Sequence, residues 1–260
     1  MLWLPKSPFQ LTSAEGVLLD PATSDGKAKN IRYDPAARTV GGTSLQGQVR
    51  ELLTAMMGRF AAEAHALVDR LFPSYGASLQ TRLVSFRPVG IEGRPASPRK
   101  DDARLHVDAF ASRPNQGQRI LRVFTNINPH GRPRVWNVGE PFEDFARRFL
   151  SRVPRYSPAL AWCLERLHIT KSRRTEYDHI MLHLHDLAKL DLDYQRTAPA
   201  HRFEFPPGTV WICFSDQVLH AALAGHYMME QTYFLPVEGM VRPERAPVRV
   251  LERLVGHPLL

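Results

Sequence analysis

Hydrophobic positions in the first third of the chain predict one long helix. Apolar residues recur at helical spacing over residues 45–71, and Pro73 ends the pattern. The preceding residues, 1 to about 44, are rich in Gly, Pro, Ser and Asp, which is typical of loops. Short strands, such as one at 16–19, are expected within those loops.

The pattern then changes from helical spacing to alternation, which predicts strands. Strands are expected at 77–89, 104–110, 118–127 and 133–138, and a second group at 203–205, 210–214, 218–223 and 231–236. Between the two groups, 140–153, 158–168 and 175–190 have helical periodicity. Residues 90–102 contain two prolines, two glycines and several charges, so we expect a mobile loop there.

Short strands on both sides of a helical insertion predict an α+β fold. The expected core is a distorted double-stranded β-helix, or jelly roll, with helices packed outside it. A chain of 260 residues with 43% hydrophobic content can form this as one domain over 1–260. In that interpretation, 1–75 are N-terminal loops and the long helix, 77–240 are the jelly-roll core, and about 140–190 are the insertion.

Cysteine content and the N-terminal residues predict a cytoplasmic protein. The two cysteines, Cys163 and Cys213, lie in apolar surroundings, which argues against a disulfide framework and favours a reducing compartment. The first residues lack a basic region followed by an apolar core, so a secretory signal is not expected. No apolar run is long enough to span a bilayer, which predicts a soluble or peripheral protein.

The formal net charge of +8 indicates an acidic partner. Nucleic acid, an anionic membrane surface, or a phosphorylated or carboxylated substrate would each meet that requirement. The sequence has no RNP, zinc-finger or helix-turn-helix pattern, so nucleic acid is not the expected partner.

A histidine and a carboxylate in the predicted strand 104–110 are candidate metal ligands. His106 and Asp108 alternate with apolar residues, so both side chains point the same way, roughly 6–7 Å apart at the backbone. His220, on a distant predicted strand, supplies a third ligand. Two histidines and one carboxylate leave coordination positions open for a non-heme Fe(II) that binds oxygen and an organic acid. The competing interpretation is a buried, salt-bridged strand.

Other histidines compete with this assignment. His226 could replace His220, but it follows Gly225 and is expected in a turn, so His220 is favoured. A second group lies at helical spacing but lacks the glutamate of a zinc-protease helix, and we interpret it as a helix face. That group comprises His179, His183, His185 and Asp186.

An organic-acid co-substrate such as 2-oxoglutarate would also need a cation for its far carboxylate. Arg122 lies one hairpin after Asp108, and Asn126 and Asn128 share its face of the strand and could hydrogen-bond the acid. Arg119, on the opposite face, is the alternative. An outer-face salt bridge explains Arg122 about as well.

A further basic set follows this strand. Arg132 and Arg134 with Trp136 combine guanidinium groups and an aromatic plate, which suits an anionic sugar or phosphate. Ordinary surface charge is the competing interpretation.

Three separated segments resemble the Kdo 3-hydroxylase family. These are 104–110 (RLHVDAF), 121–129 (LRVFTNINP) and 214–221 (FSDQVLHA), the last followed by Glu230-Gln231-Thr232. Members of that family are Fe(II)- and 2-oxoglutarate-dependent dioxygenases that hydroxylate the sugar 3-deoxy-D-manno-oct-2-ulosonic acid (Kdo) of lipopolysaccharide. The resemblance implies a jelly-roll core, iron on His106, Asp108 and His220, and 2-oxoglutarate and O2 as co-substrates.

The substrate implied by the resemblance is Kdo attached to lipid A, hydroxylated at C3. Kdo carries a carboxylate and lipid A carries phosphates, so a basic protein would be attracted to it at the cytoplasmic face of the inner membrane. An alternative function is a jelly-roll module without catalytic activity that binds anionic glycolipid or nucleic acid through its basic surface.

Overall fold

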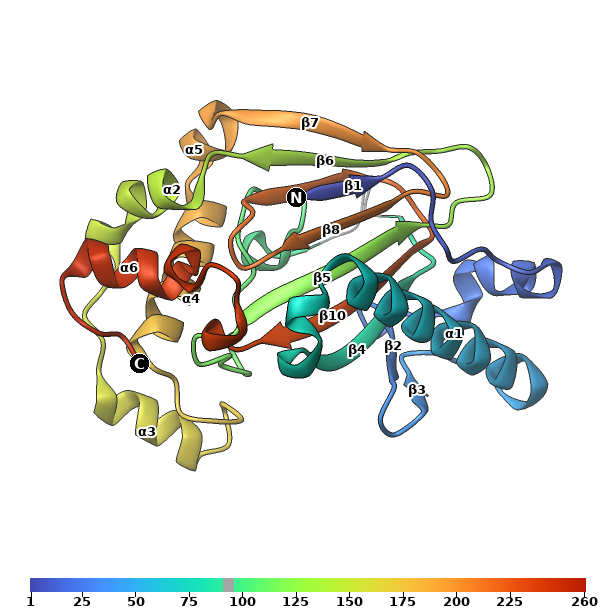
Figure 1. The fold of residues 1–260 in the computed structure, drawn as a ribbon, viewed down its shortest axis with the longest axis horizontal. Helices are drawn as coiled ribbons and strands as arrows, with labels where there is room; N and C mark the ends of the chain where they lie inside the picture. The colour runs from blue at the N-terminus through green and yellow to red at the C-terminus, as the bar shows by residue number, and fades with distance from the viewer. Residues whose placement is uncertain (91–95) are drawn as a thin grey trace.

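Two antiparallel sheets form the centre of the computed structural model, which describes residues 1–90 and 96–260 (Figure 1). The large sheet contains, in spatial order, β1 (Leu2–Leu4), β8 (Val210–Phe214), β5 (Arg119–Asn126), β10 (Met228–Leu235), β4 (Gln80–Arg87), β2 (Ile31–Asp34) and β3 (Thr39–Gly41). The small sheet contains β7 (Ala200–Phe205), β6 (Arg134–Gly139) and β9 (His220–Ala224). This mixed α+β arrangement agrees with the predicted fold class.

Helices cover the sheets from two directions. They are α1 (Gly47–Leu71), α2 (Phe142–Phe149), α3 (Pro158–Arg166), α4 (Glu176–Leu190), α5 (Leu192–Thr197) and α6 (Pro247–Val255). The long helix α1 lies against the large sheet, whereas α2, α4 and α6 gather at the other end of the molecule (Figure 1). Within the described residues, no helix combines the length and the apolar character needed to cross a bilayer.

The apolar positions of α1 explain its place. Leu53, Met56, Phe60 and Val68 are all buried against the large sheet, as the helical spacing predicted. Burying each such side chain stabilises the fold by roughly 1.5–3 kcal/mol. Pro73 follows the last turn and begins a short 3-10 helix, Pro73–Ser78, so the predicted end of the helix is confirmed.

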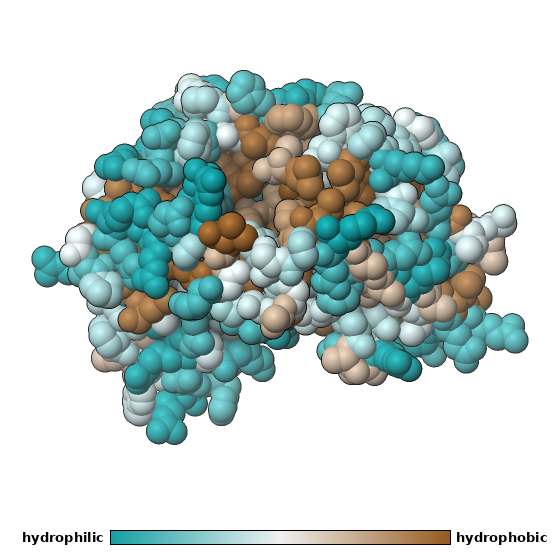
Figure 2. Space-filling model, in the orientation of Figure 1, coloured by the Kyte–Doolittle hydropathy of each residue, from teal (hydrophilic) through white to brown (hydrophobic). Residues whose placement is uncertain are grey.

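A third apolar cluster lies between the two sheets. Phe124 and Trp211 come from the large sheet, Trp136 and Phe205 from the small one, and their rings stack or meet edge to face. This aromatic layer holds the sheets face to face. On the face shown in Figure 2, apolar side chains gather over the region of β1 and β8, where Trp3 is half exposed.

Most of the predicted elements are present with shifted ends. The strands expected at 77–89, 118–127, 133–138, 203–205, 210–214, 218–223 and 231–236 correspond to β4, β5, β6, β7, β8, β9 and β10. The three helices of the insertion correspond to α2, α3 and α4. The predicted loop at 90–102 falls partly outside the described residues, and its described part contains the 3-10 turn Pro98–Lys100.

Two predicted strands are wrong. Residues 16–19 belong to a 3-10 helix, Ser13–Leu19, where Glu15 and Thr12 form a capping box that favours a helical turn. Residues 104–110 form no regular strand, and a single bridge joins His106 to His220. The ladder cannot continue because the flanking main-chain N–H groups donate elsewhere: Leu105 to the Gln195 side chain and Asp108 to the Ser215 carbonyl.

A buried ion pair fixes the turn before β9. The Arg119 guanidinium donates to both oxygens of Asp216, at 2.7 and 3.3 Å, and to the Gln217 side chain at 2.7 Å. Both partners of the ion pair are fully buried, and the guanidinium lies over the Phe214 ring. Burial raises the pKa of the Asp216 carboxyl, an effect that Arg119 opposes. Arg119 therefore has a structural role, and its guanidinium is bonded to Asp216 and Gln217.

Removing one partner of this pair is expected to destabilise the fold strongly. Asp216→Ala leaves the Arg119 charge buried and unpaired, which costs about 3–5 kcal/mol of unfolding free energy. Urea denaturation would measure the loss. The matched control is Asp193→Ala, which removes the exposed ion pair with Arg196 and should change stability by less than about 0.5 kcal/mol. Equal effects from the two substitutions would contradict a structural role for the buried pair.

Candidate metal centre

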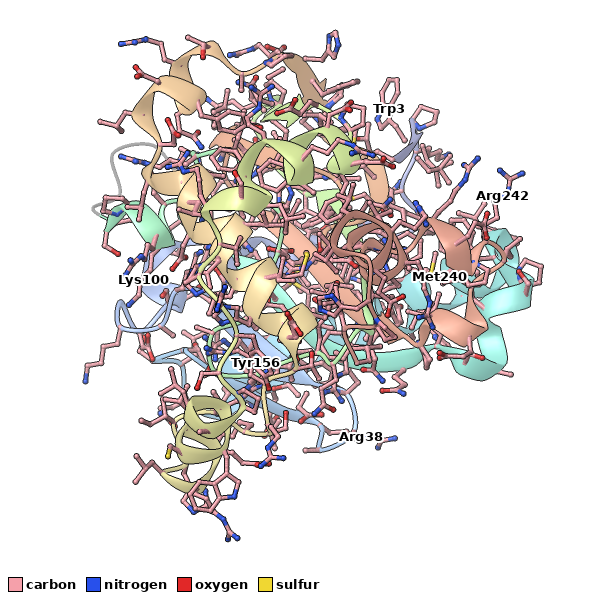
Figure 3. The ribbon with its side chains drawn as sticks, turned by 90° about the vertical axis from the view of Figure 1, so that its left-hand side faces the viewer. Trp3, Arg38, Lys100, Tyr156, Met240 and Arg242 are labelled. Atoms are coloured by element: carbon pink, nitrogen blue, oxygen red, sulfur yellow. The ribbon has the colours of Figure 1, made fainter. Side chains whose placement is uncertain are left out.

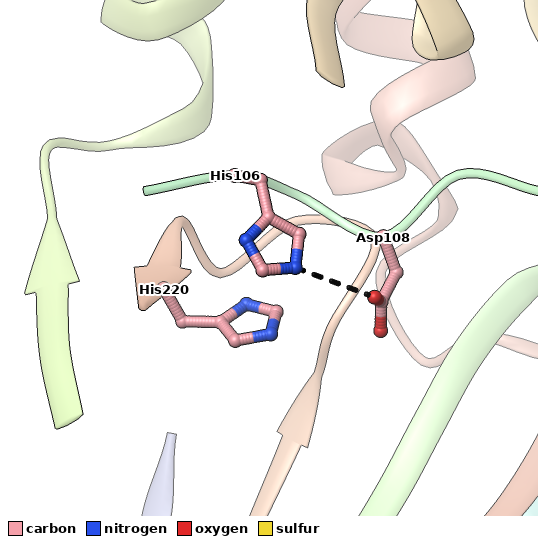
Figure 4. Close-up of side chains that lie close together, drawn as sticks. All are labelled: His106, Asp108 and His220. Atoms are coloured by element: carbon pink, nitrogen blue, oxygen red, sulfur yellow. Dashed lines mark ion pairs between the residues drawn. The ribbon is translucent and has the colours of Figure 1, made fainter. Parts of the chain in front are cut away.

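Three predicted ligands converge in one buried cluster. One ligand atom from each of His106, Asp108 and His220 lies within 4.8 Å of the other two (Figure 4). His106 Nε2 is 3.9 Å from Asp108 Oδ1, and the two imidazole rings are 4.6 Å apart between centroids. Atoms at these separations can bind one common ion, and this ligand set leaves coordination positions for other molecules.

Main-chain hydrogen bonds hold the ligands opposite one another. His106 N donates to His220 O at 3.0 Å, and His220 N donates to His106 O at 2.8 Å. Leu105 and Val107 are buried in the cluster of α2, α4 and α6, so the alternating side chains of His106 and Asp108 turn to the other side. The alternation therefore predicted correctly that His106 and Asp108 turn to the same side, although the segment is not a regular strand.

Both imidazoles have a fixed tautomer. His106 Nδ1 lies 2.7 Å from Arg104 O, and His220 Nδ1 lies 2.8 Å from Val218 O. A carbonyl oxygen only accepts hydrogen bonds, so each Nδ1 carries the proton and each Nε2 keeps a lone pair. Hydrogen bonds of this kind orient metal-binding histidines and make them more basic ligands.

The protonation states of the cluster also suit a cation. Burial lowers the pKa of both imidazoles, most strongly that of His106, where the neighbouring His220 adds to the effect. Burial alone would raise the pKa of the Asp108 carboxyl, but the Arg122 guanidinium holds it well below its usual range. Neutral imidazoles and an ionised carboxylate are the forms that bind metal.

An ion-pair network extends from Asp108 across three strands. Arg122 Nη2 lies 3.1 Å from Asp108 Oδ2, and Arg122 Nη1 lies 2.8 Å from Glu230 Oε1. The other oxygen of Glu230 pairs with Arg87 Nη2 at 2.9 Å. Glu230, on the central strand β10, thus holds one arginine from β5 and one from β4. The interpretation of Arg122 as an outer-face salt bridge is wrong, because its side chain points into the site.

Unsatisfied donors line the same region. The Nε atoms of Arg87 and Arg122 are buried and lack a hydrogen-bond partner in the part of the chain that the structure describes. The indole Nε1 of Trp136 is also buried without a hydrogen-bond partner among the described residues. The Trp136 ring stacks on the His220 ring, with 4.8 Å between the ring centroids. Buried donors without partners are costly, so these three atoms suit an anionic ligand beside the histidines.

Arg87 was missed by the sequence interpretation. It ends β4 and is paired with Met228, so it reaches Glu230 only through the sheet register. A sequence signal did exist: Glu230 is a carboxylate within an otherwise largely apolar strand, and such a group needs a cationic partner. Nothing in the spacing of Arg87 itself identified it as that partner.

The predicted set at 132–136 divides into two parts. Arg132 is exposed, but Arg134 and Trp136 are buried, and Arg134 Nη1 donates to Gly225 O at 2.7 Å. Ordinary surface charge therefore describes Arg132 only. Trp136 belongs to the metal centre because it contacts His220.

Asn126 and Asn128 do not lie at the centre. Asn126 Nδ2 donates to the carbonyls of Arg132 and Phe205, and Asn126 Oδ1 accepts from the main chain of Asn128. Asn128 Oδ1 accepts from His130 N. Both amides thus support the connection from β5 to β6, about 13 Å along the strand from Arg122 in the case of Asn126. Their assignment as 2-oxoglutarate ligands stays a prediction, and the hydrogen bonds present assign both amides to the main chain.

The competing histidines also have defined places. His226 lies beside Tyr227, and the cluster of ligand atoms contains His220 instead. His179 bonds Pro154 O, as expected for a helix face. His185 differs, because its ring lies 5.3 Å from that of His106 and its Nδ1 pairs with Asp186. Sequence reasoning missed this contact, which depends on how α4 packs.

Comparisons with known proteins give an independent result. The family model described as 3-deoxy-D-manno-oct-2-ulosonic acid (Kdo) hydroxylase matches residues 1–258. Among curated proteins, no significant match is found. The structure superimposes on the Kdo hydroxylase KdoO, a non-heme Fe(II) α-ketoglutarate-dependent dioxygenase, in complex with α-ketoglutarate and Fe(III). That comparison gives a TM-score of 0.95 at 45% identity, and covers 100% of this chain and 87% of the other.

Two further KdoO structures agree. The complex with cobalt(II) gives a TM-score of 0.96 at 46% identity, covering 99% of this chain and 86% of that one. The complex with succinate and Fe(III) gives 0.95 at 45% identity, with the same coverage. A family match over nearly the whole sequence, together with these structures, shows that this chain belongs to the Kdo hydroxylase family.

Proposed function

We propose that this chain is an Fe(II)- and 2-oxoglutarate-dependent dioxygenase that hydroxylates C3 of Kdo in Kdo-lipid A. The observation that carries the proposal is the buried cluster of His106, Asp108 and His220, with both Nε2 atoms available as ligands. Membership of the Kdo hydroxylase family supplies the reaction and the sugar. The related KdoO binds Fe(III), cobalt(II), α-ketoglutarate and succinate, which supports the same cofactor and co-substrate here.

The two sheets support a distorted jelly roll as the core. They face each other across the aromatic layer, and β9 of the small sheet carries His220 to the bridge with His106. The large sheet is widened by β1, β2 and β3 from the N-terminal 41 residues, so this segment is an integral part of the core. This arrangement supports the proposal of a single domain over 1–260.

Iron in this site would activate oxygen while 2-oxoglutarate is converted to succinate and CO2. The protein's own residues fix the geometry around it. Asp108 directs Oδ1 toward His106 and Oδ2 toward Arg122, so that only one carboxylate oxygen faces the cluster. The remaining positions are thereby left for the two small molecules. Trp136 and the apolar layer behind it keep bulk water from one side of the cluster.

2-Oxoglutarate is proposed to bind beside Arg122. The Nε donors of Arg122 and Arg87 and the Nε1 donor of Trp136 would each gain a partner from its carboxylates. Glu230 keeps both arginines close together despite their like charge. In this proposal, Arg122 and Arg87 together bind 2-oxoglutarate, where the sequence predicted Arg122 alone.

We propose that the positive charge of the protein attracts its anionic substrate. The net charge of +8 complements the Kdo carboxylate and the lipid A phosphates, and the exposed Arg132 is available to contact them. We therefore place the enzyme at the cytoplasmic face of the inner membrane, in peripheral contact with it. A binding module without catalysis would not need three buried ligands in metal-binding protonation states.

Turnover tests the reaction. The purified chain with Fe(II), 2-oxoglutarate, O2 and Kdo-lipid A should form succinate and a Kdo product 16 mass units heavier, in about equal amounts. Asp108→Ala should lower the rate at least about 1,000-fold, because a lost carboxylate removes both a metal ligand and the partner of Arg122. Mass spectrometry of the lipid and succinate quantification would measure both. Undiminished turnover of Asp108→Ala would contradict the assignment.

Metal binding tests the ligands separately from activity. Co(II), titrated anaerobically by calorimetry, should bind the unaltered protein, and His220→Ala should weaken binding at least about 100-fold. The matched control is His183→Ala, which removes a partly buried histidine of α4 outside the cluster and should leave affinity unchanged. A loss of equal size in both variants would reject the specific site.

The proposed role of Arg87 can be tested separately from metal binding. Arg87→Gln should raise the KM for 2-oxoglutarate about 10- to 100-fold, the loss expected for a charged hydrogen bond of about 1.5–3 kcal/mol. Co(II) affinity should stay the same, because Arg87 does not touch a predicted metal ligand. Arg82→Gln, on the exposed part of the same strand, is the control. An unchanged KM in Arg87→Gln would remove Arg87 from the proposed site.

A further inference from the structure

A short hairpin carries an unusual group of exposed apolar side chains. Residues 155–174 contain α3 and the turn after it, and we call them the α3 hairpin. Its exposed large apolar residues are Leu160, Trp162, Leu167 and Ile169, which are 58%, 45%, 69% and 56% exposed. Of the 15 large apolar side chains exposed in the described residues, these four fall within ten positions. Apolar side chains gathered in this way indicate a contact surface.

The packing of α3 gives no reason for these side chains. Ala161 is the buried residue of α3, whereas α2 and α6 each bury four residues. The helix projects from the body of the molecule in both views, beside the labelled Tyr156 in the second (Figures 1 and 3). These four exposed side chains therefore have no structural role in the core of this chain.

Positive charge surrounds the apolar residues. The hairpin has one carboxylate, Glu165, against five cations: Arg155, Arg166, Lys171, Arg173 and Arg174. The Arg166 guanidinium lies 5.4 Å from the Trp162 ring centroid. Apolar side chains with a tryptophan, bordered by arginine and lysine, have the chemistry of a helix that lies in an anionic membrane interface.

Hydrogen bonds tie the base of the hairpin to the segment that follows Asp108. Lys171 N donates to Ser112 O at 2.9 Å, and the Arg174 guanidinium donates to Ala111 O at 2.7 Å. Tyr156 closes the base of the hairpin through a bond from its hydroxyl to Arg174 O. Ala111 and Ser112 follow Asp108 by three and four positions, so a surface that binds the hairpin also lies near the segment that carries Asp108.

We propose that the α3 hairpin docks the protein on an anionic phospholipid bilayer. The proposal rests on the proposed function and extends it, because a sugar linked to lipid A is presented at such a surface. A second copy of the chain is the less suitable occupant, since two hairpins would bring ten cations and only two carboxylates together. The apolar side chains would enter the interface while the cations meet lipid phosphates.

The two cysteines allow a direct measurement. Cys163 is exposed on α3 and Cys213 is buried, so an environment-sensitive nitrobenzoxadiazole dye can be attached at Cys163 alone. The labelled full-length chain would be titrated with vesicles of phosphatidylethanolamine and phosphatidylglycerol, and separately with phosphatidylcholine vesicles. Binding of the unlabelled chain would be measured by vesicle sedimentation. No lipid A and no turnover are involved, so failure of the proposed reaction would not affect this result.

Matched variants separate the hairpin from the rest of the surface. Leu167→Ser with Ile169→Ser removes two apolar groups, and Leu192→Ser with Val241→Ser removes two that are similarly exposed elsewhere, at 65% and 63%. Arg166→Gln with Arg173→Gln removes charge from the hairpin, and Lys6→Gln with Arg70→Gln removes it from other exposed positions. The thermal unfolding midpoint of all four variants should match that of the unaltered chain, which shows that each variant is folded.

We expect a blue shift of the dye on the anionic vesicles only, and binding that weakens with added salt. Each hairpin variant should raise the lipid concentration for half-binding by about tenfold, while its control stays at the value of the unaltered chain. Equal binding of hairpin and control variants would overturn the proposal, as would a dye at Cys163 that does not respond. A dimer in solution that the apolar hairpin variant dissociates would also overturn it, by assigning the surface to a second copy.

Discussion

The balance of buried charge around Asp108 is the constraint on which the site depends. Asp108, Arg122, Glu230 and Arg87 alternate in sign, and neighbouring members of this series lie 2.8–3.1 Å apart. An unpaired charge in such surroundings would cost several kcal/mol, so each group is kept only because the next one is present. The series runs over three adjacent strands, so the charge state of Asp108 depends on the sheet register.

Hydrogen bonds and ring stacking hold the two histidines in place as well. Their Nδ1 atoms are committed to carbonyls of their own segments, two residues before each ring. Their main chains bond to each other, and Trp136 stacks on one of the rings. The site is therefore preorganised by the polypeptide before any ion binds, which reduces the reorganisation that metal binding would require.

The packed core lies on one side of this cluster, and the chain leads to an exposed basic segment on the other. Behind it are the aromatic layer between the sheets and the helices α2 and α4, which fix the segment of His106 through Leu105 and Val107. The buried Arg119–Asp216 pair sets the turn whose Ser215 carbonyl holds the main chain of Asp108. Beyond Asp108 the chain continues to the anchors of the α3 hairpin, so one connected segment joins the core, the ligands and an exposed basic surface.

The sequence by itself determined the features that depend on local pattern. The period of α1, the alternation that turns His106 and Asp108 to the same side, and the identity of His220 within an apolar strand were all readable, because each depends on neighbouring residues. The tertiary structure decided the rest. Whether Arg119 or Arg122 faces the site depends on the strand's orientation in the sheet, and the partnership of Arg87 with Glu230 depends on a register between segments 143 residues apart. The partners of Asn126 and Asn128 could not be predicted, because the connection from β5 to β6 decides what an amide at the end of the strand bonds to. The sequence states the chemical type of each residue, but the partners of that residue depend on long-range packing.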